Sequence, residues 1–131
     1  EALTALNTRS VAVLTPYPEA TNKAEREFLE QSGFVVTNIE GMDMRGIGRI
    51  YEAEMPFLYR NSMKMDRKGA DVFFLSCVAL DTLGFVGRLE QDLGVPVITS
   101  HQATLWYALR RCGVRDIMPQ FGKLFTLDKP D

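Results

Sequence analysis

The sequence predicts an α/β protein of three layers, in which helices cover both faces of a four-stranded parallel sheet. Two observations predict this class. Short apolar runs alternate four times with helix-like stretches, and the third predicted strand, residues 70–77, contains the unbroken apolar run 72–75, as expected of a strand buried on both faces. Short connections between such elements indicate right-handed βαβ units. We expect residues 1–131 to form a single lobe.

The predicted strands are short apolar runs that end at turn residues. They span residues 11–14, 34–41, 70–77 and 95–100. The first strand runs into Thr15-Pro16-Tyr17-Pro18, where two prolines prevent further strand pairing.

Each predicted helix has apolar residues at helical spacing and a glycine at its end. These helices span residues 22–33, 51–69, 80–94 and 102–113. In the first helix we expect Asn22 to be the N-cap and Glu25 its capping-box partner. Phe28 and Leu29 are expected to face the core.

The remaining segments have no clear period. Residues 41–50 are predicted to be a glycine-bearing loop, and residues 114–131 a C-terminal tail with one short strand. Residues 1–6 look like the end of a helix, and the chain begins without methionine. We therefore expect it to be part of a longer protein.

Composition limits the classes of partner. The net charge is −2 with no basic run, which argues against nucleic acid and anionic membranes. No apolar stretch approaches the roughly 20 residues that span a bilayer. The two cysteines lie in different contexts, which predicts neither a disulfide framework nor a metal site. A reducing cytoplasm is the expected compartment.

Reactive side chains are concentrated at one end of the predicted strands, the carboxyl end. In an open parallel sheet, ligands bind beyond the carboxyl ends of the strands. Those ends lead into residues 15–17, 41–49, 76–78 and 99–101, which we call the carboxyl-end rim. The rim carries hydroxyl groups, a thiol, a tyrosine and His101, the single histidine of the chain. The opposite end carries ordinary turn residues.

Cys77 is the main candidate on this rim. It would follow a strand and precede a helix, where backbone amides and the helix dipole favour a thiolate and could also bind a carboxylate. Free cysteine is equally a common buried filler. Tyr17 could donate its phenol to a carboxylate, and His101 could be an acid, a base or a cap. Each also has a purely structural interpretation. Cys112 is interpreted as structural.

A family resemblance follows from four stretches of the chain. "VAVLTPYPEATNKAEREFLEQSGFVV", "IGRI", "ADVFFLSCVAL" and "RLEQDLGVPVITSHQATLWYALRRCG" resemble the second half of the maleate cis-trans isomerase and arylmalonate decarboxylase group of the aspartate/glutamate racemase superfamily. The resemblance implies a flavodoxin-like lobe, one of two pseudo-symmetric lobes that hold a small mono- or dicarboxylic acid between them. It implies no cofactor and no metal. Residues 114–131 would then pair with the other lobe.

The resemblance also implies roles for individual residues. Cys77 matches the catalytic cysteine of the second lobe, and Tyr17 matches the tyrosine that hydrogen-bonds the substrate carboxylate. The backbone amides of Cys77 and Val78 would bind the carboxylate, and Thr15 and Ser76 flank them. Two positions depart from the group: Met44 or a neighbour stands where maleate isomerases have a substrate-binding asparagine, and His101 interrupts an "SNQA"-like segment.

Several reactions fit this pattern. Isomerase, racemase and arylmalonate decarboxylase-like lyase activities all need a reactive thiol beside a held carboxylate, and maleate isomerisation is the preferred interpretation. We expect little activity from an isolated lobe, and a partner that is either a second copy or the other lobe of a longer chain. The alternative is a non-catalytic flavodoxin-like binding module. A phospho-receiver is disfavoured because Cys77 stands where its aspartate belongs. A nucleotide-binding domain would need a glycine-rich phosphate loop that the first strand does not lead into.

Overall fold

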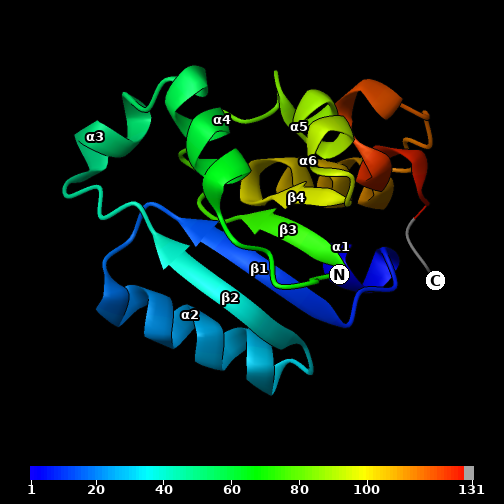
Figure 1. Cartoon of the computed structure of the whole chain (residues 1–131). Helices are drawn as coiled ribbons and strands as arrows, with labels where there is room; N and C mark the ends of the chain where they lie inside the picture. The colour runs from blue at the N-terminus through cyan, green and yellow to red at the C-terminus, as the bar shows by residue number, and fades with distance from the viewer. Residues whose placement is uncertain (129–131) are drawn as a thin grey trace.

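The computed structural model describes residues 1–128 and confirms the predicted fold class (Figure 1). Four parallel strands form the sheet, in the order β2-β1-β3-β4: β1 Ser10–Thr15, β2 Val35–Gly41, β3 Val72–Leu75 and β4 Val97–Thr99. The α-helices are α1 Ala2–Ala5, α2 Glu19–Gln31, α3 Ile47–Tyr51, α4 Met55–Lys64, α5 Val86–Leu93 and α6 Ser100–Arg111. Two 3₁₀ helices follow, η1 Pro119–Phe121 and η2 Lys123–Thr126.

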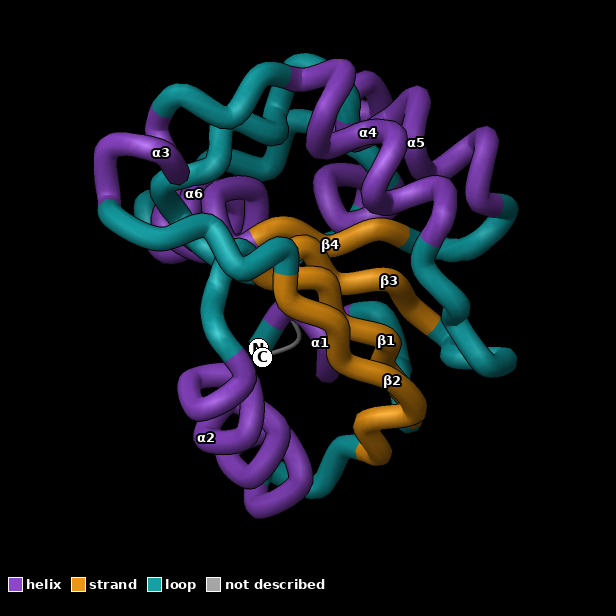
Figure 2. The backbone as a smooth tube through the Cα atoms, turned by 60° about the vertical axis from the view of Figure 1, so that its left-hand side comes forward, coloured by secondary structure: helices purple, strands orange, loops and turns teal. Residues whose placement is uncertain are grey.

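The strand order places a switch in chain direction between β1 and β3. The chain leaves β1 through α2 to reach β2 on one side, and then crosses back through α3 and α4 to β3 on the other. Right-handed crossovers in opposite directions put their helices on opposite faces of the sheet. Figure 2 shows this: α2 lies on one face and α4 and α5 on the other. Such a switch point is where open α/β sheets bind ligands.

The central strand β1 shows why both faces must be covered. Its side chains alternate between faces, as in any strand. Ala12 and Leu14 join the core beneath α4 and α5. Val11 and Val13 join the core that includes Leu29 of α2. All four are essentially inaccessible, so β1 is apolar throughout and is shielded by helices on either side.

Three sequence expectations about the helices were wrong. The segment 41–50 was expected to be a loop but contains α3. Helix α5 begins at Val86, six residues later than the predicted start of the 80–94 helix. Phe28 was expected to face the core but is 68% exposed, whereas its neighbour Leu29 is buried as expected.

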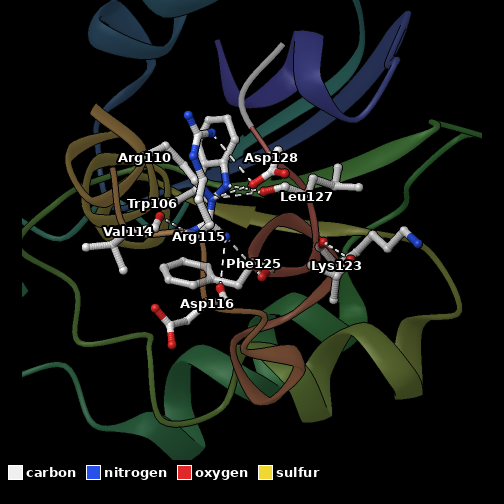
Figure 3. A network of polar contacts seen from close by, with 10 residues as sticks. Trp106, Arg110, Val114, Arg115, Asp116, Lys123, Phe125, Leu127 and Asp128 are labelled. Carbon is white, nitrogen blue, oxygen red and sulfur yellow. Dashed lines mark hydrogen bonds and ion pairs between the residues drawn. The ribbon is translucent and has the colours of Figure 1, made fainter. Parts of the chain in front are cut away.

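The tail packs against α6 of its own lobe. Leu124 and Phe125 form a buried cluster with Trp106. The buried guanidinium of Arg110 donates to four backbone carbonyl groups of this segment (Figure 3). These acceptors are Leu127 at 3.1 Å, Val114 at 2.9 Å, Asp116 at 3.2 Å and Phe125 at 3.3 Å. The short strand expected in the tail is absent from residues 114–128, which form η1 and η2 instead. Residues 129–131 of the tail lie outside the described residues. Pairing of this tail with another lobe stays a prediction.

Candidate functional site

The structure brings the expected loops together at the carboxyl ends of the strands. The arrowheads of β1, β2 and β3 point to this end of the sheet (Figure 1). Two hydrogen bonds tie the loop after β2 to the loop after β1: Met42 N–H donates to the Thr15 carbonyl (2.8 Å), and Met44 N–H to the Pro16 carbonyl (2.8 Å). Beyond β3, Ser76 N–H donates to the Leu14 carbonyl (2.9 Å) and extends the pairing with β1. The carboxyl-end rim is therefore a connected set of loops centred on the switch point.

Gly41 allows the close approach of β2 to the Tyr17 loop. A Cβ atom at this position would overlap the Tyr17 carbonyl oxygen and would lie 2.6 Å from Nδ2 of Asn22. Only glycine fits such a contact without moving the backbone. The end of β2 and the loop after β1 are thus packed against each other through their backbones.

Cys77 lies at this switch point in an unusual backbone conformation. Its side chain is nearly buried, with 7% of the residue exposed, and its φ is +139°. A residue other than glycine with a positive φ is strained by about 1–3 kcal/mol and needs surrounding contacts to hold it. One such contact is clear: Cys77 N–H donates to Oγ of Ser100 at 3.0 Å. The structure therefore holds Cys77 between β3 and the start of α6.

The helix expected directly after Cys77 is not there. Residues 78–85 form an irregular segment with two turns, at 78–79 and 83–85, and α5 starts only at Val86. The buried Thr82 explains the delay, since its hydroxyl donates to Oγ1 of Thr99 at 2.8 Å and ties this segment to β4. The dipole of α5 therefore does not act on the Cys77 thiol as predicted. The first turn of α6, at Ser100, is the helix terminus beside it.

Tyr17 meets Cys77 across the rim. Its hydroxyl is hydrogen-bonded to the Cys77 thiol. The pKa of the Tyr17 phenol is raised, first by burial, then by this hydrogen bond, and further by the charges of Cys77 and Glu25. At neutral pH the phenol therefore remains protonated and can donate a hydrogen bond.

The buried Thr15 side chain stabilises the loop that carries Tyr17. It is fully buried, and its hydroxyl accepts from Tyr17 N–H (3.1 Å) and donates to Oδ1 of Asn22 (2.5 Å). Asn22 was expected to cap α2, but the helix begins three residues earlier, at Glu19, after Pro18. Asn22 instead lies buried within α2 and fixes the start of the Tyr17 loop. Its role was missed because the N-cap position was misplaced.

Glu25 was also missed as a member of the rim. Because α2 begins at Glu19, Glu25 lies within the helix, where its carboxyl group forms a hydrogen bond with the nearly buried Ser76. Burial raises the pKa of Glu25, and the hydrogen bond to Ser76 offsets part of that rise. The sequence did contain a signal for this role. Glu25 follows Asn22 by three residues, so the two side chains share a helix face, and that face reaches the rim.

The remaining predicted site residues lie on the outer parts of the rim. Val78 is 60% exposed. His101 is half-buried in the first turn of α6, and within residues 1–128 its Nδ1 is the one buried side-chain nitrogen or oxygen without a hydrogen-bond partner. Cys112 is exposed at the far end of α6, and neither it nor Cys77 is in a disulfide.

An open cavity of about 1070 Å³ lies beside Tyr17. The basic side chains Lys23, Arg26 and Arg45 line it, together with Asn22. Cys77 is not part of its lining, so this cavity is not by itself the place of thiol chemistry. Among residues 1–128, no group of three or more His, Cys, Asp or Glu side chains is placed to hold a metal ion. In the same range, no helix has the length and apolar character needed to cross a membrane.

Comparison with known proteins shows that this chain has relatives of similar sequence. The family described as arylmalonate decarboxylase matches residues 1–125. Maleate isomerase of Pseudomonas putida is 28% identical over 130 residues, which cover 96% of this chain and 51% of that protein. Arylmalonate decarboxylase of Bordetella bronchiseptica is 30% identical over 126 residues, which cover 94% of this chain and 52% of that protein.

Solved structures show the same fold. Nocardia farcinica maleate cis-trans isomerase bound to Tris superposes with a TM-score of 0.90 at 22% identity, over 95% of this chain and 51% of that one. A variant of the same enzyme with a covalently bound succinylcysteine intermediate superposes with a TM-score of 0.89 at 21% identity, with the same coverage of both chains. This chain thus spans about half the length of the relatives it matches.

Proposed function

Because the chain belongs to the arylmalonate decarboxylase family, a family of enzymes, we propose that it carries the Cys77 half of a cofactor-independent active site for a small mono- or dicarboxylic acid. The reaction that we favour for this site is maleate cis-trans isomerisation. The observation that carries the proposal is the contact between the Tyr17 hydroxyl and the Cys77 thiol at the switch point of the sheet.

The geometry supports thiol chemistry in three ways. Cys77 is held in a strained backbone conformation at the place where α/β sheets bind ligands. Tyr17 stays protonated and can donate to a thiolate or to a substrate carboxylate. Ser100 and His101 begin α6, where free first-turn amides favour a negative charge.

In an isomerase, the Cys77 thiolate would add to one alkene carbon of a cis dicarboxylate. A new S–C bond forms, and the electron pair of the π bond moves onto the adjacent carboxylate-bearing carbon. Rotation about the resulting single bond, followed by return of that pair and expulsion of the thiolate, leaves the trans acid with no net transfer of protons. The succinylcysteine intermediate described for the Nocardia enzyme is an adduct of this type.

A decarboxylase is the second candidate, and the 30% identity to the Bordetella enzyme favours it. Here the substrate would lose carbon dioxide to leave a carbanion, and the Cys77 thiol would deliver the proton to that carbon. Both reactions ask for the same parts from this chain: a reactive thiol, a phenol donor and a clamp for a carboxylate.

A single lobe leaves the carboxyl-end rim open. The share of the relatives that the chain spans, about half, supports a complete site formed with another lobe or with a second copy of the chain. Closure would exclude water and strengthen the hydrogen bonds to a bound carboxylate.

The test is adduct formation. Incubation with maleate is followed by an acid quench, which supplies the proton that converts the carbanion of the adduct into a stable succinyl group. The Cys77 peptide should then gain the mass of one maleic acid and the Cys112 peptide should gain none, because we propose a carboxylate-binding site beside Cys77 alone. Cys77→Ser should lose the adduct, and Cys112→Ser, which removes the exposed thiol, is the matched control. Production of fumarate from maleate or of an arylacetate from an arylmalonate, followed by NMR, then separates the two reactions. Equal labelling of both cysteines, with neither product formed, would contradict the proposal.

A further inference from the structure

The amide of Cys77 is already in use. The family resemblance assigns this N–H to the substrate carboxylate, but in the structure it donates to Oγ of Ser100 at 3.0 Å. An amide has a single hydrogen to give. A carboxylate beside the thiol therefore meets the Ser100 hydroxyl where it was expected to meet the Cys77 amide.

Ser100 has a hydrogen to offer at that place. Its hydroxyl accepts from Cys77, and among residues 1–128 no group accepts from it in return. A serine hydroxyl can accept and donate at once, and its hydrogen rotates to suit an acceptor.

The start of α6 adds to this site. Thr99 is the N-cap and forms a reciprocal capping box with Gln102, which uses the Gln102 amide. The first-turn amides of Ser100 and His101 have no partner within the helix and point toward its N-terminus. The helix is twelve residues long, so its dipole favours an anion at this end. Two independent features, an occupied amide with a free hydroxyl and a helix N-terminus, thus meet at Ser100.

We propose that Ser100 is a substrate-binding residue, whose hydroxyl holds the Cys77 amide and donates its own hydrogen to the carboxylate of the acid bound beside the thiol. The inference rests on the proposed function and names the group that recognises its substrate class. The exposed Val78 stays free to offer its amide to the same carboxylate.

A pair of alkylating reagents tests this directly. Iodoacetate and iodoacetamide both let a thiolate displace iodide to form an S–C bond, and they differ in carrying a carboxylate or a neutral amide. The rate constants of both reagents are measured at Cys77 and at exposed Cys112 by mass spectrometry of the two peptides. At each cysteine, the rate constant with iodoacetate is divided by the rate constant with iodoacetamide. The readout is this ratio at Cys77 divided by the same ratio at Cys112.

In the wild-type chain we expect this readout to exceed one, because the rim attracts the carboxylate reagent. Ser100→Ala should lower it by about tenfold, the value of one lost hydrogen bond to a charged group. Thr104→Ala, which removes a hydroxyl one turn along the same helix, should leave it unchanged. Circular dichroism and thermal unfolding of all variants show whether the fold persists, because the exposed Cys112 would be alkylated in an unfolded chain as well. If Ser100→Ala does not fold, Ser100→Thr and Ser100→Val compare hydroxyl and methyl at constant shape, and only the valine variant should lose the preference.

The outcomes separate this inference from the proposed function. A wild-type readout at or below one, with Cys77 no faster than Cys112 toward iodoacetamide, would overturn the proposed function and this inference with it. A wild-type readout above one that survives in both Ser100→Ala and Ser100→Val would overturn the role of Ser100 alone.

Discussion

Glu25 is the residue on the rim whose charge opposes the proposed chemistry. An ionised carboxylate next to Ser76 would repel both a thiolate at Cys77 and a substrate carboxylate. Burial raises the pKa of Glu25, so the structure favours its neutral form. The hydrogen bond with Ser76 acts in the opposite sense and lowers the pKa, but burial is the larger of the two effects.

This shift predicts how stability depends on pH. Because the pKa of Glu25 is raised on folding, the unfolded state loses its proton first as the pH rises, and the folded state is favoured most at low pH. The stability due to neutral Glu25 is present below the ordinary glutamate range and is lost as the pH rises through the raised pKa of the folded state. Glu25→Gln should therefore match the wild type at low pH and be more stable than it at neutral pH.

Guanidinium unfolding across that pH range measures the effect. Glu27→Gln is the matched control, since Glu27 is exposed two residues along the same helix. It should leave the pH dependence of the unfolding free energy unchanged. A Glu25→Gln variant whose stability ran parallel to the wild type at every pH would contradict the buried environment described for this carboxyl group.

At the scale of elements, the contact between β2 and the loop after β1 shapes the site. Gly41 ends β2 against the Tyr17 carbonyl oxygen and the Asn22 side chain. Asn22 in turn holds Thr15, which accepts from the Tyr17 amide. The position of the Tyr17 hydroxyl therefore depends on a strand end and a helix that are distant from Cys77 in the chain.

Gly41→Ala is expected to disturb this contact. The added Cβ would force the backbone of the Tyr17 loop to move, at a cost of about 1–3 kcal/mol in the free energy of unfolding. Alkylation of Cys77 should change with it, because Tyr17 would no longer hold the thiol. Gly48→Ala is the control, since a Cβ there meets nothing within 4 Å and lies in the short helix α3. It should be neutral or should stabilise by less than about 1 kcal/mol. Equal stability of the two variants in thermal unfolding would argue against the contact.

At the scale of the whole molecule, Arg110 joins α6 to the C-terminal segment. Arg110 is 3% exposed, and its guanidinium donates to four carbonyl groups of residues 114–127 (Figure 3). Trp106 adds a fifth contact, from its Nε1 to the Leu127 carbonyl at 3.0 Å. The segment thus covers the far side of α6 and completes the third apolar cluster.

Removing this guanidinium should loosen the whole segment. Arg110→Met keeps an apolar stem but leaves the Val114 and Asp116 carbonyl groups without their Arg110 donor. It also removes one of two donors from Leu127 and from Phe125, so we expect a loss of about 3–5 kcal/mol in unfolding free energy. Limited proteolysis should then cut after residue 113 sooner than in the wild type. Arg111→Met, at the exposed neighbour, should change neither measurement by much. Unaltered proteolysis of Arg110→Met would show that the apolar cluster alone holds the segment.

Much of this fold follows from local patterns. The apolar run at 72–75 reflects burial of β3, and the glycines that end α2, α5 and α6 reflect backbone conformation within a few residues. The patterns failed where distant contacts decide. Thr82 was predicted to be part of a helix, but its hydrogen bond to Thr99 holds it in the irregular segment before α5. Phe28 fitted an apolar stripe, yet it is exposed on the described lobe.

Local sequence patterns alone predicted the alternation of strands and helices along the chain, the end of the sheet that carries reactive groups, and Cys77 and Tyr17 as candidates. These follow from periodicity and from the rule that parallel strands end together. Three further features became visible in the folded chain: Tyr17 contacts Cys77, Glu25 and Asn22 belong to the rim, and Ser100 accepts the hydrogen of the Cys77 amide. Each of these depends on hydrogen-bond and contact distances between segments far apart in the chain, which packing sets and local sequence does not encode.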